Sequence, residues 1–269
     1  MIMPNMIYGT AWKKENTASL VEEALLCGFK AIDTACQPKH YREDLVGIGL
    51  ENAIKNGIKR EDIFIQTKFT PIAGQDRTNM PYEASDDILT QLEKSFYKSK
   101  QNLKVDFIDS YLIHSPFAPL EDLIKVYKTM EEFVISGEVG QIGISNCYDI
   151  NLLAYLYDIA KVKPKVIQNR FYAETSYDKE IREFARQKGI MYQSFWSLTA
   201  NPQLLKLDEI QTLAKNYKRT VPQIFYKFLN HLGITPLNGT TSKTHMQQDL
   251  DIKSFSLEED EVNSILRYI

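Results

Sequence analysis

The sequence predicts an α/β fold, a single (β/α)8 TIM barrel that takes up the whole chain, residues 1–269. The length is close to the ~250 residues that such a barrel needs. About eight short apolar runs alternate with longer amphipathic stretches, which is the pattern of strands connected by helices. No GxGxxG motif follows the first run, whereas an open dinucleotide-binding sheet usually carries one there. Together these observations favour the closed barrel over the open sheet.

The predicted strands are rich in apolar, β-branched and aromatic residues. Such runs are typical of parallel strands that are buried on both faces of a sheet. Helical crossovers between consecutive strands then require parallel pairing. In chain order the predicted strands are 6–8, 31–33, 63–68, 107–114, 141–145, 166–168, 190–195 and 234–237.

The predicted helices carry apolar residues at every third or fourth position, which places these residues on one helix face. The clearest cases are Ile88, Leu92 and Phe96 in one segment, and Leu123, Tyr127, Met130 and Val134 in another. Thr220 and Gln223 have the spacing of a capping box, which predicts a helix start. Ser256 and Glu259 have the same spacing and predict the start of the last helix.

Composition and charge exclude several classes of protein. The formal net charge of −3 argues against a nucleic-acid-binding surface, which needs a basic patch. No run of ~18 apolar residues predicts a membrane span, and residues 1–5 lack the segments of a secretory signal. Three cysteines without CxxC spacing predict reduced thiols and no metal site. We therefore expect a cytoplasmic protein without metal, nucleic-acid or membrane partners.

Polar residues stand at the predicted C-terminal ends of five consecutive strands, where barrels of this kind carry their active sites. Taken singly, an aspartate there is most often a turn former, a lysine is solvated, and a histidine makes one structural hydrogen bond. Because the five strand ends converge on one pocket, their joint pattern predicts a functional site. These residues are Asp33, Lys68, His114, the pair Ser145 and Asn146, and the pair Gln168 and Asn169. The long irregular segment 70–81 after the third strand is predicted to be a functional loop.

Five sequence blocks at these strand ends resemble the aldo-keto reductases. The blocks occur in the order of that family and span most of the chain, from Tyr8 to about Leu250. They are residues 28–35, 66–68, 112–116, 143–146 and 166–168. The resemblance implies an enzyme that reduces aldehydes or ketones to alcohols by hydride transfer from NADP(H) or NAD(H). It also implies a catalytic tetrad of Asp33, Tyr41, Lys68 and His114.

The residue types of this tetrad suit carbonyl reduction, which needs a hydride at carbon and a proton at oxygen. Tyrosine has an ordinary pKa of ~10, so it is a weak acid at neutral pH. We expect Lys68 to lower the pKa of Tyr41 by stabilising the phenolate. Asp33 is expected to compensate the buried lysine charge. His114 is expected to hydrogen-bond the carbonyl oxygen of the substrate.

The position of the tyrosine departs from the family pattern. The family usually places it five residues after the aspartate, where this chain has Pro38. The segment around Tyr41 resembles the segment that normally follows the catalytic tyrosine, which indicates a three-residue insertion. A purely structural role for Tyr41 at the start of a helix is the alternative. His40 is the rival acid, although we expect it to reach the pocket only if the loop folds differently.

The resemblance also implies the residues that bind the nicotinamide half of the cofactor. Its amide is expected to contact Ser145, Asn146 and Gln168, whose short polar groups offer both donors and acceptors. Phe195 aligns best with the family's aromatic residue that stacks on the ring, and Trp196 is the alternative; a core position is the other interpretation of either residue. The remaining expected contacts of this half are Gly9, Thr10 and Asp33, with Ser197, Leu198 and Thr199 along the pyrophosphate.

At the adenosine end the chain differs from the family pattern. The usual Ile-Pro-Lys-Ser segment is replaced by residues 235–238, and Gly239, Thr240 and Thr241 follow. His245 stands where the family has an arginine for the 2′-phosphate, and Asp249 stands where it has an asparagine. The loss of fixed positive charge predicts a weakened preference for NADP(H), the usual cofactor of the family, and use of NAD(H). Lys243 is either a compensating cation or a solvated helix lysine.

The substrate pocket implied by the resemblance is apolar and aromatic. Its expected residues are Trp12, Tyr41, Phe69, His114 and Phe117. Such walls suit small aldehydes, ketones or sugar-like carbonyls. By family habit the protein is expected to be a monomer.

Two other functions are compatible with a barrel of this composition. Lys68 could act as a Schiff-base nucleophile in an aldolase, but that chemistry gives no role to Ser145, Asn146 and Gln168. A catalytically weak sensor or partner subunit that binds a dinucleotide is the second alternative. A displaced Tyr41 and a weakened phosphate clamp would both favour this second alternative.

Overall fold

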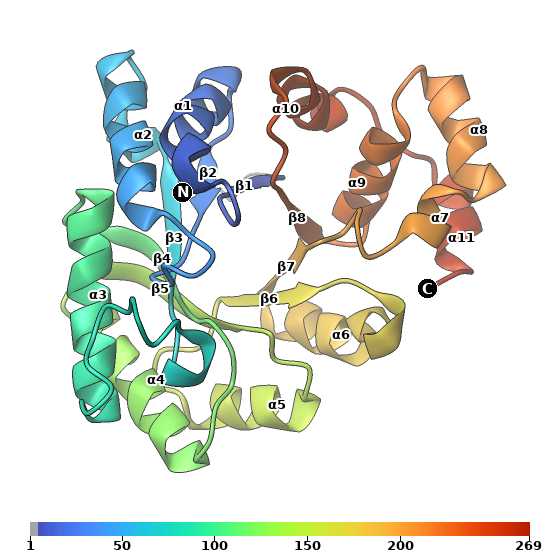
Figure 1. Cartoon of the computed structure of the whole chain (residues 1–269). Coiled ribbons are helices and arrows are strands. Elements are labelled where there is room, and N and C mark those ends of the chain that lie inside the picture. The colour runs from blue at the N-terminus through green and yellow to red at the C-terminus, as the bar shows by residue number, and fades with distance from the viewer. Residues whose placement is uncertain (1–4) are drawn as a thin grey trace.

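Eight parallel strands form one closed barrel in the order β1 to β8, each strand pairing with its neighbours in the chain and β8 pairing with β1 (Figure 1). This is a computed structural model, and it describes residues 5–269. The strands are β1 (Ile7–Gly9), β2 (Ala31–Asp33), β3 (Phe64–Phe69), β4 (Ile108–Ile113), β5 (Val139–Ser145), β6 (Val166–Arg170), β7 (Met191–Phe195) and β8 (Ile234–Asn238). The predicted (β/α)8 barrel is confirmed.

Helices surround the barrel and connect consecutive strands. Those before β6 are α1 (Thr17–Cys27), α2 (Glu43–Lys55), α3 (Ile88–Leu103), α4 (Leu120–Ile135) and α5 (Ile150–Ile159). Those after β6 are α6 (Lys179–Lys188), α7 (Pro202–Leu205), α8 (Asp208–Tyr217), α9 (Val221–His231), α10 (Lys243–Leu250) and α11 (Glu259–Leu266). The helices α3 and α4 bury the apolar faces that their spacing predicted: Phe96 of α3 stacks on Phe133 of α4 at a centroid distance of 4.1 Å.

All eight predicted strands are present, and their ends shift by two residues at most. The capping box at Thr220 is confirmed, since its side chain and that of Gln223 satisfy each other's backbone amides at the start of α9. The capping box at Ser256 was wrong. The last helix is capped by Glu258, with Glu261 as the reciprocal partner, because a carboxylate can accept from the same free amides as a hydroxyl.

The register of the barrel brings the polar strand ends to one rim. Asp33 pairs with Gln66 across β2 and β3, and Gln168 pairs with Ser145 on one side and with Gln193 on the other. In a parallel barrel all C-terminal strand ends open on the same face, so the loops that follow them line one mouth. Among residues 5–269 no helix is both long and apolar enough to cross a membrane. Residues 1–4, which entered the expectation about a secretory signal, lie outside the described part of the chain.

Candidate active site

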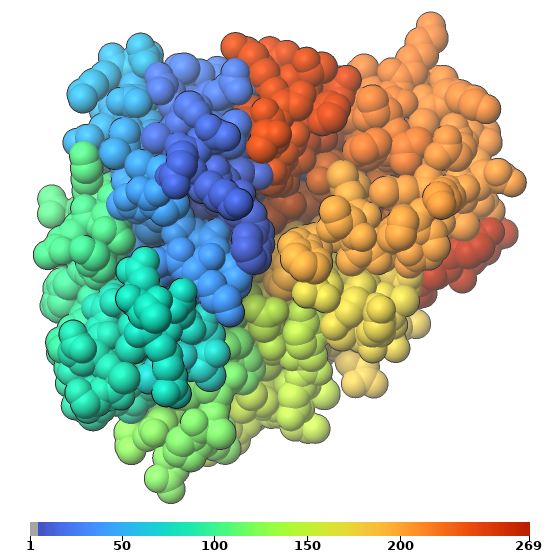
Figure 2. Space-filling model, viewed as in Figure 1, coloured from blue at the N-terminus to red at the C-terminus, as the bar shows by residue number. Residues whose placement is uncertain are grey.

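A cavity of about 1130 Å³ opens at the C-terminal end of the barrel. Figure 2 shows the molecule hollowed between its N-terminal segments, in blue, and its C-terminal segments, in orange and red. One end of the cavity holds Asp33, Tyr41 and His114, and the other holds His245 and Asp249. The two groups that the sequence predicted for catalysis and for adenosine binding therefore share one continuous space.

Asp33 and Lys68 form a buried ion pair beneath the cavity. The Lys68 ammonium lies 2.7 and 2.6 Å from the two carboxylate oxygens of Asp33, and it also donates to the Thr34 carbonyl at 2.9 Å. Burial lowers the pKa of Lys68, and the Asp33 carboxylate opposes this shift. Lys68 does not itself line the cavity. Its ammonium lies next to the Asp33 carboxylate and close to the Tyr41 ring, both of which belong to cavity residues.

A ring of buried amides supports the carboxylate of Asp33. Gln66 and Gln168 each donate to Asp33 Oδ1, at 2.7 and 2.9 Å. Both amides also donate to Gln193 Oε1, and Gln193 returns a hydrogen bond to Gln66 at 3.1 Å. Buried polar groups that are all paired in this way are held in one arrangement. Asp33 and Gln168 are thus rigid parts of the cavity floor.

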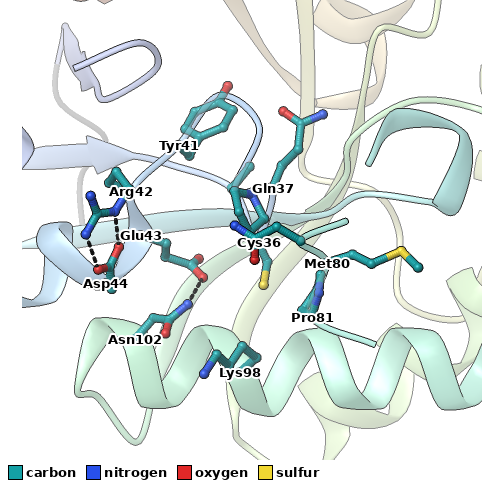
Figure 3. Close-up of a pocket in the computed structure, with 13 residues that line it drawn as sticks. Cys36, Gln37, Tyr41, Arg42, Glu43, Asp44, Met80, Pro81, Lys98 and Asn102 are labelled. Carbon is teal, nitrogen blue, oxygen red and sulfur yellow. Dashed lines mark hydrogen bonds and ion pairs between the residues drawn. The ribbon is translucent and has the colours of Figure 1, made fainter. Parts of the chain in front are cut away.

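Tyr41 lies on the loop between β2 and α2, and its ring is close to both Lys68 and His114. The Lys68 ammonium is 5.7 Å from the ring centroid, and the His114 ring is 5.9 Å away, centroid to centroid. In Figure 3 Tyr41 points away from Glu43, whose carboxylate meets Asn102 of α3 beside a smaller hollow of about 480 Å³. The side chains of Tyr41 and Glu43 therefore point in different directions, and Tyr41 lines both cavities.

The expected direction of the Tyr41 pKa was wrong. Burial raises the pKa of Tyr41 above its ordinary value, and the negative charge of Asp33 raises it further. The Lys68 ammonium favours the phenolate, but Asp33 compensates its charge at close range, so Lys68 does not offset the effect of burial on this pKa. Tyr41 is consequently protonated at neutral pH, which is the form that a general acid needs.

His114 follows β4 and is held at three points. Its backbone amide donates to the Phe69 carbonyl at 2.8 Å, and its carbonyl accepts from Asn146 Nδ2 at 2.9 Å. Its ring atom Nδ1 lies 2.7 Å from Thr70 Oγ1. Burial lowers the pKa of His114 well below its ordinary value, and the nearby positive charges of Lys68 and His40 act in the same direction. The imidazole is therefore neutral at neutral pH.

His40 lines the cavity, contrary to the expectation that it would do so only with a different loop path. Its carbonyl accepts from the Trp12 amide at 2.8 Å, and its ring lies 3.9 Å from the Trp12 ring. Burial and the charge of Lys39 lower the pKa of His40. The contact between the two loops holds His40 and Trp12 together, and both residues line the cavity.

The residues expected around the nicotinamide amide fit such a group. Gln168 uses its amide hydrogens on Asp33 and Gln193, so its Oε1 remains as an acceptor. Ser145 Oγ donates to the Gln168 carbonyl at 2.7 Å and still has lone pairs to offer. Asn146 adopts a positive φ of 52°. All three line the cavity, and the Asn146 Nδ2 hydrogens are used on the His114 carbonyl and on Ser145 Oγ. The amide hydrogens of a carboxamide would therefore meet acceptor atoms there.

Phe195 and Trp196 both line the cavity, but their surroundings differ. The guanidinium of Arg170 lies 4.3 Å from the centroid of the Trp196 ring, in a cation–π contact. Trp196 is 51% exposed and has a positive φ of 54°. Because Arg170 occupies a face of Trp196, Phe195 at the end of β7 is the better candidate to stack on a nicotinamide ring.

The end of the cavity that is expected to bind adenosine contains one buried carboxyl group, that of Asp249. Asn238 donates to the Asp249 carboxylate and accepts from the Thr240 amide at 2.6 Å. Burial raises the pKa of Asp249 to about 7. Lys243, the candidate for a compensating cation, does not line the cavity; its ammonium lies 3.8 Å from Glu23. His245 lines the cavity beside Thr240.

Besides Lys68 and Lys243, five residues expected at the site lie outside the cavity. Phe69 is fully buried against Tyr82 and Phe117, because side chains alternate along β3 and Lys68 points inward. Phe117 packs on Phe69 and does not line the cavity either. The others are Thr10, which donates to the Asp33 carbonyl, Thr241, which is exposed, and Asn169, which donates to Cys147 and Asp178.

Several cavity residues were not predicted. Lys13 follows Trp12 and donates to the Gly239 carbonyl, so it supplies a cation near the adenosine end. Asn238 ends β8, and the rule that barrel strand ends carry the site would have indicated it. Gln37, Tyr226 and Gln248 also line the cavity. They come from a loop and two helices, and no pattern in the sequence identifies them.

The sequence profile of the Aldo/keto reductase family matches residues 5–268. Glyoxal reductase of Bacillus subtilis is 28% identical over 91% of this chain and 80% of its own length. Methylglyoxal reductase DkgA of Escherichia coli is 27% identical over 99% of this chain and 90% of its own. The NAD(P)H-dependent D-xylose reductase of Pachysolen tannophilus is 26% identical, over 95% and 87%.

Solved structures agree with this match. The aldo-keto reductase MGS-M4 from a Medee basin deep-sea metagenome library superposes with a TM-score of 0.83 at 28% identity, over 99% of this chain and 92% of that one. The Bombyx mori aldo-keto reductase in complex with NADP shares the fold, with a TM-score of 0.83 at 23% identity over 99% and 89% of the two chains. With a family match over nearly its whole length, the chain belongs to the aldo/keto reductase family.

Proposed function

We propose that Tyr41 is the general acid of this NAD(P)H-dependent reductase of aldehydes and ketones. The observation that carries the proposal is the position of the Tyr41 ring, 5.7 Å from the Lys68 ammonium and 5.9 Å from the His114 ring. Tyr41 lines the cavity together with His114, and Lys68 lies behind it. A proton donor, a hydrogen-bond donor for the carbonyl and a buried cation therefore meet at one end of the cavity.

The side chains divide the work of carbonyl reduction among them. When bound, the reduced cofactor supplies a hydride for the carbonyl carbon. Tyr41 Oη gives its proton to the carbonyl oxygen, and His114 orients that oxygen by a hydrogen bond. The phenolate that remains is stabilised by the Lys68 ammonium. Asp33 holds this ammonium in place as its buried counter-ion.

His40 is the second candidate for the acid, because it lines the cavity beside Tyr41. The two candidates can be separated by Tyr41→Phe and His40→Gln, each assayed by the loss of reduced nicotinamide over a panel of aldehydes and ketones. We expect Tyr41→Phe to lower kcat by at least ~100-fold with cofactor affinity retained, since general acids contribute ~10² to 10⁴. Retained turnover in Tyr41→Phe and its loss in His40→Gln would assign the acid to His40.

The sensor or partner-subunit alternative makes a different prediction for the same assay. Cofactor binding without turnover of any carbonyl, in the unmodified protein, would favour it. A Schiff-base mechanism through Lys68 predicts a covalent adduct after borohydride treatment with substrate. The ion pair of Lys68 with Asp33 argues against that mechanism, because a nucleophilic lysine must be neutral.

For the substrate we propose small aldehydes, including those with a neighbouring oxygen function. The relatives are named for glyoxal, methylglyoxal and D-xylose, and the catalytic end of the cavity is walled by Trp12, His40 and Tyr41. Ranking kcat/KM over aldehydes of increasing size and hydroxylation tests this. A clear preference for large apolar ketones would contradict it.

For the cofactor we propose that the 2′-phosphate clamp is weakened and that NADH is usable. The adenosine end carries Asp249 and His245, while Lys243 faces Glu23. Lys13 supplies one cation at this end, which is fewer than a lysine and an arginine would supply. Comparing kcat/KM for NADPH and NADH tests the proposal. A preference for NADPH of about a hundredfold or more in kcat/KM would refute it.

A further inference from the structure

Thr70 is the first residue after β3 and is buried, with 2% of its surface exposed. Its hydroxyl oxygen lies 2.7 Å from Nδ1 of His114. The backbone of His114 is fixed separately, by Phe69 on one side and Asn146 on the other. These backbone contacts do not hold the imidazole ring itself. Among residues 5–269 the ring is hydrogen-bonded by Thr70, and it packs against the Tyr41 ring at 5.9 Å, centroid to centroid.

The direction of this hydrogen bond determines the tautomer of His114. Within residues 5–269 the Thr70 hydroxyl has no partner other than His114 Nδ1. If Nδ1 carried the proton, the hydroxyl hydrogen would be buried without an acceptor, which is unfavourable. If the hydroxyl donates, Nδ1 is the acceptor and the single proton of the neutral imidazole is on Nε2. The second arrangement satisfies both groups.

The rest of the loop after β3 holds Thr70 and, at the same time, the segment that leads to Tyr41. The Thr70 carbonyl accepts from the Tyr82 hydroxyl at 2.7 Å and from Gln75 Nε2 at 3.3 Å. The same Gln75 amide donates to the Cys36 carbonyl at 2.9 Å. Gln37 donates to the Gly74 carbonyl at 2.6 Å, and Figure 3 shows Cys36 and Gln37 close to Tyr41.

We propose that Thr70 is a positioning residue, whose hydroxyl keeps His114 in the tautomer with hydrogen on Nε2 and turns that N–H toward the substrate carbonyl. The loop between β3 and α3 then fixes the distance between His114 and Tyr41. It is hydrogen-bonded to the His114 ring through Thr70, and to Cys36 and Gln37, which precede Tyr41 in the chain. The catalytic use of this arrangement rests on the proposed function. The tautomer itself does not, and it can be measured without substrate.

The experiment compares Thr70→Val with Thr70→Ser in the full chain. Valine keeps the branched shape and removes the hydroxyl, whereas serine keeps the hydroxyl. Nitrogen NMR of histidine-labelled protein reports the tautomer directly, and only four histidines need assignment, with His114→Gln identifying the relevant signals. Carbonyl turnover and cofactor affinity are measured on the same samples, and thermal unfolding checks that each variant is folded.

We expect the unmodified protein and Thr70→Ser to show His114 with hydrogen on Nε2. In Thr70→Val we expect a mixture of tautomers and a fall in kcat of about tenfold, the effect of one lost hydrogen bond, with cofactor affinity retained. Hydrogen on Nδ1 in the unmodified protein, or an unchanged tautomer and kcat in Thr70→Val, would overturn the proposal. A tautomer that depends on Thr70 in a protein without turnover would support the positioning role and refute the proposed function instead.

Discussion

The two ends of the cavity are built on opposite principles. At the catalytic end the charged groups are buried and paired. The Lys68 ammonium donates to both carboxylate oxygens of Asp33, and the amides of Gln66 and Gln168 donate to the same carboxylate. At the adenosine end Asp249 is buried with Asn238 as its partner and without a cation on its carboxylate, among residues 5–269. His245 is exposed at the rim.

This difference indicates that the catalytic end is sensitive to substitution, whereas cofactor preference can be changed. A buried ion pair is costly to alter, because removing one partner leaves the other charge uncompensated. The catalytic end therefore tolerates little change. Charged side chains near the surface contribute less to the free energy of folding, so one of them can be substituted without a large loss of stability. Cofactor choice, which depends on such charges around His245, is expected to respond to single substitutions that leave the barrel intact.

The largest effect is expected from Lys68→Met, which breaks the catalytic end. Activity should fall by at least ~100-fold, because the phenolate of Tyr41 loses its cation. The free energy of unfolding should fall by ~3–5 kcal/mol, because Asp33 stays buried without a counter-ion. Carbonyl turnover and denaturant unfolding measure the two effects.

The double variant Asp33→Asn with Lys68→Met is the matched control. It removes both charges, so it should recover part of the lost stability while remaining inactive. Gln66 and Gln168 can still donate to an asparagine oxygen at this position. Equal stability of the single and the double variant would mean that the charge of Asp33 does not matter to folding.

A smaller effect is expected from adding charge at the adenosine end. His245→Arg should raise the affinity for NADPH relative to NADH by about tenfold, because a guanidinium forms charge-assisted hydrogen bonds with a phosphate. Fluorescence titration with each cofactor measures the ratio, and His245→Gln controls for the loss of the imidazole. No change in the ratio would show that the 2′-phosphate does not reach His245.

The smallest effect is expected from Asp249→Asn, and it depends on pH. The pKa of Asp249 is raised to about 7, so the carboxylate becomes charged as the pH rises through that value. Its charge should then oppose the 2′-phosphate, and the affinity for NADPH relative to NADH should fall about fivefold, equal to ~1 kcal/mol. Asp249→Asn should flatten this dependence. A pH profile identical in the two proteins would rule out Asp249 as its cause.

The stability of the unmodified protein should fall over the same rise in pH. A carboxyl whose pKa is raised on folding stabilises the fold below the ordinary pKa near 3.8, and this contribution is lost as the pH rises through about 7. Asp249→Asn should therefore be more stable than the unmodified protein above pH 7 and differ little under acidic conditions. Thermal unfolding over this pH range tests the sign.

Much of the site could be predicted because it lies at the ends of regular elements. Asp33, His114, Ser145 and Gln168 end or follow predicted strands, and the closure of the barrel brings them to one cavity. Phe69 was misplaced although the alternation of side chains along β3 assigns it to the face opposite Lys68. Lys13, Gln37 and Thr70 lie in loops, whose paths are determined by contacts with distant segments rather than by local pattern.

The sequence by itself determined the barrel, its strand order and the chemical types of residue at its mouth, because periodic burial and βα alternation admit one closed topology. Only the tertiary structure decided that burial raises the pKa of Tyr41, that His40 lines the cavity and that Lys243 faces Glu23. The physical reason is that these features depend on electrostatics and burial. Both are set by atoms far apart in the chain, and a shift of a few ångströms changes their effect.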